Sequence, residues 1–179
     1  MTEEPWYSAL RQEWRPDRVR LLLVGESAPD PGAAAADRRF FYAPTLSRYD
    51  NLFRGVIDAL YAPGKLDAGA DRRLWLKRLR DDGVYLIDLV PYPVNKLSAT
   101  ERRRSLHDHV SDRVDEVLDL APRGVIICHG PTFEVLSAPL RAADITMLHY
   151  EAIPFPLGNH RARFVKLFRA AHAQLDNQA

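Results

Sequence analysis

The chain has 179 residues, 46% of them hydrophobic and 27% charged, and this composition excludes a wholly disordered protein. The length predicts one domain over residues 1–179, large enough to bury a core without disulfides or metals. Lys and Arg total 25 against 24 Asp and Glu, a formal charge of +1, which excludes a global cationic field. Any nucleic-acid binding therefore depends on a local basic patch.

Apolar patterning predicts alternating strands and helices. In chain order we expect a helix at 6–14, a strand at 19–24, helices at 52–60 and 74–79, a strand at 84–89, one long helix through 106–118, strands at 124–128 and 145–149, and a helix at 164–175. A capping box from Ser98 to Glu101 opens the long helix. The first three strands are nearly unbroken apolar runs, as in parallel sheets, whereas 145–149 is weaker and suits an edge. The sequence thus predicts an α/β fold with a four-stranded, mainly parallel sheet.

Cysteine content and apolar run length limit the cofactors and the location. Cys128 is the sole cysteine, so it forms no internal disulfide and gives no support to a multi-cysteine metal site. The acidic start of the sequence lacks the plan of a signal peptide, and no apolar run approaches the ~20 residues of a membrane span. We expect a cytoplasmic protein with no membrane contact, no metal and no cofactor.

Two carboxylates stand near the carboxyl ends of predicted strands, where α/β sheets bind ligands. Glu26 follows the first strand, where it could orient water or stabilise a cation, or instead cap a helix or pair with an arginine. Asp88 is a charge within an apolar run, so it needs hydrogen-bond donors or a shifted pKa. It could read a polar ligand edge or satisfy backbone N–H groups.

Three further positions suit a nucleotide ligand, each with a structural alternative. Phe41 follows an alanine-rich loop and could stack on a base or belong to the core. Asn95 could bind a base edge or form a turn. Arg161 adjoins a Pro-Gly loop at a predicted helix start, where it could bind phosphate or lie on a solvated face.

The segment Cys128-His129-Gly130-Pro131 suggests a different chemistry. A cysteine at a strand end, before a helix and beside a histidine, is how a nucleophile elbow presents a thiolate. These residues resemble the elbow of the cysteine hydrolases that include the intracellular PfpI proteases. The alternative is a buried strand cysteine.

Taken in their order along the chain, the loops after the predicted strands resemble those of the uracil-DNA glycosylase superfamily. The resemblance extends from about Leu21 to Arg169. Residues 25–29, Gly-Glu-Ser-Ala-Pro, are similar to the first motif of its Gly-Glu members. Phe41 falls where the family places the ring that stacks on the extruded base, and residues 85–88 resemble the strand that ends in the base-reading residue. Residues 153–159 are similar to the last motif, a loop inserted into the DNA minor groove. The resemblance implies a three-layer αβα sandwich around a four-stranded parallel sheet.

For function, the resemblance implies hydrolysis of the N-glycosidic bond of a flipped base, with DNA as partner. Glu26 would then act on the cationic sugar or its water, with Asn159 or His160 supplying a further polar contact. Base-binding residues would be Gly25, Phe41, Asp88 and Asn95, and DNA-backbone residues would be Pro154, Pro156, Gly158 and Arg161.

Three positions depart from the family pattern. Asp88 replaces Asn, Phe155 replaces His and Leu157 replaces Ser. An ionised Asp88 accepts hydrogen bonds but donates none, so amino-bearing base edges suit it better than uracil O4. The alternatives are a nucleobase-binding or nucleic-acid-binding member without catalysis, and the Cys128 hydrolase. Some members that resemble the Gly-Glu type hold an iron–sulfur cluster, but one cysteine cannot supply its four thiolates.

Overall fold

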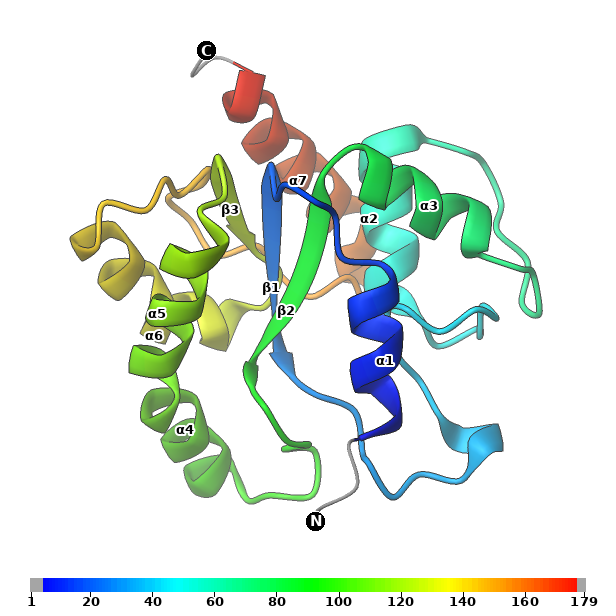
Figure 1. Cartoon of the computed structure of the whole chain (residues 1–179), viewed down its shortest axis with the longest axis horizontal. Helices are drawn as coiled ribbons and strands as arrows, with labels where there is room; N and C mark the ends of the chain where they lie inside the picture. The colour runs from blue at the N-terminus through cyan, green and yellow to red at the C-terminus, as the bar shows by residue number, and fades with distance from the viewer. Residues whose placement is uncertain (1–4, 177–179) are drawn as a thin grey trace.

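The structure, a computed structural model, describes residues 5–176 (Figure 1). Its elements, in order, are α1 Trp6–Glu13, β1 Leu21–Ser27, the 3₁₀ helix η1 Ala35–Asp37, α2 Asn51–Tyr61, α3 Arg73–Asp81, β2 Val84–Val90, α4 Ala99–Asp108, α5 Val110–Leu120, β3 Gly124–Ile127, α6 Gly130–Ala142, the 3₁₀ helix η2 Gly158–His160 and α7 Arg161–Asp176. The predicted α/β class is confirmed.

The sheet of the described residues has three parallel strands in the order β2-β1-β3. Their mainly apolar runs are buried from Leu21 through Gly25, throughout β2 and throughout β3, because helices lie on both sides of the sheet (Figure 1). Leu21 pairs with Val84 on one side and with Gly124 on the other. The three strong strand predictions are therefore confirmed.

The prediction of a fourth strand at 145–149 is wrong. This segment runs parallel to β3 but forms only an isolated bridge between Val125 and Met147. Backbone bonds join Val125 N–H to the Thr146 carbonyl and Leu148 N–H to the Val125 carbonyl. The next donor, the Ile127 N–H, binds the Nε2 of His149 at 2.9 Å instead of a backbone carbonyl. The ladder ends because a side chain takes the place of the next backbone partner.

The prediction of one long helix through 106–118 is also wrong. The helix is interrupted at His109, which caps the end of α4 and the start of α5. The Nδ1 of His109 lies 2.8 Å from the Ser105 carbonyl oxygen. The capping box is confirmed, since Ser98 and Glu101 bond each other's backbone N–H. The sequence indicates α6 only as a helix that follows Cys128, without bounds. Pro139 lies in its interior, where proline is unfavourable in a helix.

Helices α4 and α6 contact the sheet on one side, and α3 and α7 contact it on the other (Figure 1). Helices α2 and α7 approach closely at Gly55, where a Cβ atom would lie 2.9 Å from the Phe164 ring and 3.0 Å from the Pro156 Cβ. This contact seats the loop before α7 against α2. The loop then carries Phe155 to the carboxyl ends of the strands.

Candidate functional site

The register of β1 and β2 brings the predicted acidic residues to one place. Gly25 pairs directly with Asp88, and Glu26 is the next residue of β1. A Cβ atom on Gly25 would lie 2.7 Å from the Asp88 Oδ1, closer than such atoms approach. Glycine at this position therefore leaves room for the Asp88 carboxylate against the backbone of β1.

Asp88 is buried and is bound by a residue that the sequence analysis missed. Its Oδ2 accepts a hydrogen bond from the guanidinium of Arg11, on α1. Burial raises the pKa of Asp88 to about 6, and Arg11 and Arg113 limit the rise. The only sequence signal was that a buried carboxylate needs a partner, without indicating which one. Among the described residues no hydrogen bond reaches Oδ1, so that oxygen is left for a ligand.

Glu26 is held by residues of α4 and of the segment before α6, not by α1. The guanidinium of Arg102, on α4, donates to both of its carboxylate oxygens. The Nε2 of His129 lies 3.8 Å from Glu26 Oε2, and its Nδ1 lies 2.9 Å from the Thr132 hydroxyl oxygen. Burial lowers the pKa of His129, so this imidazole is neutral at pH 7. The arginine-pairing alternative for Glu26 is therefore realised, with the carboxylate fixed in one orientation.

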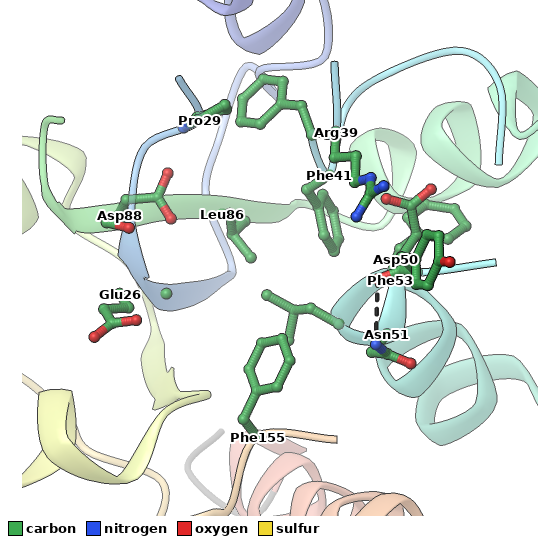
Figure 2. Close-up of a pocket in the computed structure, with 15 residues that line it drawn as sticks. Glu26, Pro29, Arg39, Phe41, Asp50, Asn51, Phe53, Leu86, Asp88 and Phe155 are labelled. Carbon is green, nitrogen blue, oxygen red and sulfur yellow. Dashed lines mark hydrogen bonds between the residues drawn. The ribbon is translucent and has the colours of Figure 1, made fainter. Parts of the chain in front are cut away.

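Both carboxylate residues line a cavity of about 250 Å³ that has an aromatic wall. In Figure 2, Glu26 and Asp88 lie on one side of the hollow, and Phe41 and Phe155 reach into it from other elements. The lining residues are Gly25, Glu26, Ser27, Pro29, Arg39, Phe40, Phe41, Tyr49, Asp50, Asn51, Leu52, Phe53, Leu86, Asp88 and Phe155. The cavity thus has two carboxylates at the strand ends, and its other walls combine aromatic rings with the polar side chains of Arg39, Asp50 and Asn51.

Phe41 is both a core residue and a wall residue. It is 9% exposed and packs edge-on against Tyr42 and Phe53, with ring centroids 5.2 and 5.3 Å apart. Phe155, in the loop before α7, is 37% exposed. The wall therefore combines one ring fixed by the core with one more accessible ring.

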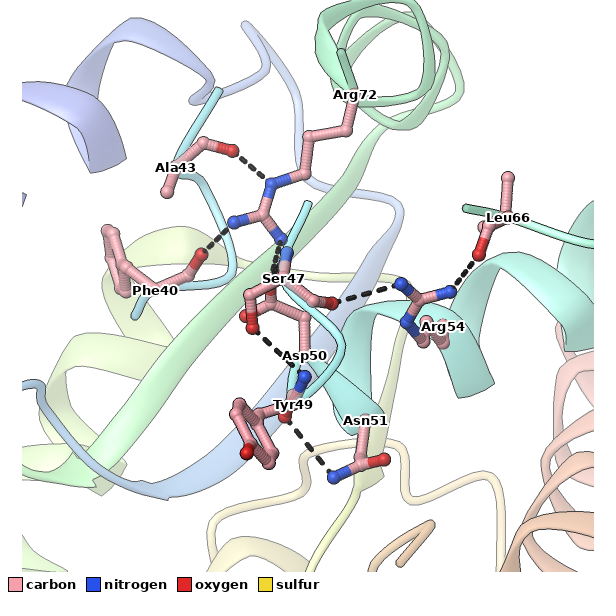
Figure 3. Close-up of polar contacts among 9 residues, drawn as sticks. All are labelled: Phe40, Ala43, Ser47, Tyr49, Asp50, Asn51, Arg54, Leu66 and Arg72. Atoms are coloured by element: carbon pink, nitrogen blue, oxygen red, sulfur yellow. Dashed lines mark hydrogen bonds and ion pairs between the residues drawn. The ribbon is translucent and has the colours of Figure 1, made fainter. Parts of the chain in front are cut away.

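A buried arginine fixes the loop that bears this wall (Figure 3). Arg72 is 1% exposed, donates to the carbonyls of Phe40 and Ala43, and lies 3.4 Å from the Asp50 carboxylate. Asp50 also accepts the Ser47 N–H. No local pattern in the sequence indicates this role, because charged residues are rarely buried so completely.

Several predicted site residues lie away from the cavity. Asn95, Asn159 and His160 are exposed and are not among its lining residues. Arg161 donates to the Asp58 carboxylate through Nε and Nη2 at 3.0 and 2.6 Å, so its charge is already paired.

The loop residues proposed for the DNA backbone are only partly accessible. Pro156 is buried against α2, and Pro154 is half-buried. Gly158 is exposed and has a positive φ of 54°, which suits the turn into η2. Of these three residues, only Gly158 is exposed.

The Cys128 thiol lies in an environment unlike that of a nucleophile. It is 0% exposed, and burial raises its pKa well above the usual range. Its Sγ donates a long hydrogen bond to the Ile126 carbonyl oxygen, at 3.9 Å. The structure therefore favours the buried strand cysteine over the hydrolase elbow.

Within residues 5–176 no cluster of three His, Cys, Asp or Glu side chains has the arrangement needed to hold a metal ion. In the same range no helix has the length and apolarity needed to span a membrane. Comparison with models of known protein families gives no match, and comparison with curated protein sequences gives none either.

Proposed function

We propose that this protein hydrolyses the N-glycosidic bond of a base flipped out of DNA. The observation that carries the proposal is that Glu26, Phe41 and Asp88, far apart in the sequence, line one cavity. Its volume of about 250 Å³ lies just below the ~300 Å³ at which pockets for drug-sized ligands begin. That size suits a single flat heterocycle.

The aromatic wall would hold the base, and Asp88 would read its edge. Rings stack on any base without selecting one, so selection falls to the free Oδ1 of Asp88. Below about pH 6 the protonated carboxyl can donate a hydrogen bond to a carbonyl edge. Above that pH the ionised carboxylate accepts from an amino edge and repels a carbonyl. Base preference should therefore change with pH.

Glu26 would act on the sugar. In the reaction, water adds its oxygen to the anomeric carbon while the bond to the base nitrogen breaks. The electron pair leaves with the base, which takes up one proton from the water. The sugar carries positive charge in the transition state, and a carboxylate fixed by Arg102 stabilises it without reorganising.

The test is a panel of oligonucleotides, each with one altered base, assayed for abasic sites at pH 5 and pH 8. We expect at least one substrate to be cut, and Glu26→Gln to slow cutting at least 100-fold. Glu13→Gln, an exposed glutamate on α1, is the matched control. Cutting at the wild-type rate by Glu26→Gln, or no cutting of any substrate, would refute the proposal.

A second candidate is a nucleobase-binding protein without catalysis. It is favoured by the ion pairs that engage both Glu26 and Asp88 with arginines. The same panel separates the two, because a binding protein would retain affinity for an oligonucleotide that it never cuts.

A further inference from the structure

The cavity has a cationic rim. Arg39, one of the lining residues, places its guanidinium carbon 4.3 Å from the ring centroid of Tyr49. Arg48 places its own 4.6 Å from the same centroid and donates a hydrogen bond to the Tyr49 hydroxyl. Two positive charges are thus gathered on one aromatic ring at the edge of the hollow.

These charges are not neutralised nearby. Among the described residues, neither Arg39 nor Arg48 forms an ion pair with a carboxylate. The neighbouring acidic residue, Asp50, directs its carboxylate toward Arg72 and the Ser47 N–H. Arg161, by contrast, is paired with Asp58, so the residue predicted from the sequence to bind phosphate is less available than this pair.

The backbone beneath the rim is held in place before any ligand arrives. The Tyr49 N–H donates to the Ser47 hydroxyl at 2.9 Å, and the Asn51 amide donates to the Tyr49 carbonyl at 3.2 Å. Arg54 donates to the Ser47 carbonyl at 3.0 Å (Figure 3). A fixed platform lowers the ordering cost of binding, because the tyrosine backbone does not have to be immobilised by the ligand.

We propose that Arg39 and Arg48, supported by Tyr49, bind a phosphoryl group attached to the nucleoside whose base enters the cavity. Guanidinium groups bind phosphate through paired N–H donors, and the exposed rim leaves those donors accessible. The inference rests on the proposed function, since it assumes that the cavity takes a base. The phosphoryl group could come from a DNA strand or from a free nucleotide, and the two arms below distinguish these sources.

The first arm measures anisotropy of a labelled, uncleavable single-stranded oligodeoxynucleotide over a series of KCl concentrations. Each phosphate contact contributes a slope of about −0.7 to log K against log salt for single strands. We expect Arg39→Gln and Arg48→Gln each to reduce the slope by about 0.7, equally for all base sequences. Arg104→Gln, an exposed arginine on α4, should leave it unchanged.

The second arm compares a nucleoside with its 5′-monophosphate by calorimetry. A rim that takes free nucleotides gives wild-type protein a preference for the monophosphate that the two variants lose. A preference seen only with the oligonucleotide assigns the rim to a DNA strand. Thermal melting of each variant checks that the fold is intact.

The failure of each proposal leaves a different result. If wild-type protein cuts no substrate but each variant shows the expected smaller salt slope, the rim stands and the catalytic proposal fails. If Arg39→Gln and Arg48→Gln keep the wild-type slope and the wild-type monophosphate preference, the rim is wrong. It is equally wrong if wild-type protein binds neither probe at low salt.

Discussion

Replacing Asp88 by Asn should stabilise the protein at alkaline pH and have little effect near pH 4. Burial raises the pKa of Asp88 from an ordinary 3.8 to about 6. The folded protein therefore binds a proton that the unfolded chain releases between these two values. Stability from the neutral carboxyl is fully present below pH 3.8 and is lost as the pH rises through 6.

The size of the effect follows from the two pKa values. At 1.36 kcal/mol per pH unit, the difference between 3.8 and about 6 corresponds to about 3 kcal/mol once Asp88 is ionised in both states. Asparagine mimics the neutral carboxyl, so Arg11 faces in the variant the same uncharged partner that it faces in wild-type protein at low pH, and the pKa of about 6 already includes the favourable effect of Arg11 on the ionised form. The advantage of Asp88→Asn over wild type should therefore rise from near zero at pH 3.5 to about 3 kcal/mol at pH 8.

Urea unfolding at several pH values between 3.5 and 8 measures this difference directly. Asp119→Asn, an exposed aspartate on α5, is the control and should show a difference from wild type that stays near zero. A constant difference between Asp88→Asn and wild type across this range would refute the argument. So would a wild-type protein that is the more stable of the two at pH 8, because the ion pair with Arg11 would then outweigh burial.

Two further substitutions and one labelling experiment test the packing around the site. Gly25→Ala places a Cβ 2.7 Å from the Asp88 Oδ1 and should cost about 1–3 kcal/mol in urea unfolding; a neutral result would mean that the carboxylate moves freely. Arg72→Met leaves Asp50 buried without its partner and should cost about 3–5 kcal/mol, whereas the exposed Arg73→Met should change stability by less than about 0.5; equal effects would contradict the buried network. Cys128 should react with iodoacetamide only after unfolding in guanidinium, and rapid labelling of the native protein at pH 8 would contradict its burial.

The sequence by itself predicted the elements whose patterns are local. Nearly unbroken apolar runs identified β1, β2 and β3, and the Ser98–Glu101 capping box identified the start of α4. It also indicated that Glu26 and Asp88 lie at the same edge of the sheet, because parallel strands place their carboxyl ends on one edge. These features depend on residues close together in the chain or on a regular sheet.

Only the tertiary structure decided what those residues contact. Arg102 and Arg11 lie 76 and 77 positions from Glu26 and Asp88, on helices whose docking no local pattern encodes. His149 ended the fourth strand by replacing a backbone acceptor, although its segment has a strand-like sequence. Periodicity records which face of an element is buried, whereas the partner of a side chain depends on how separate elements pack together.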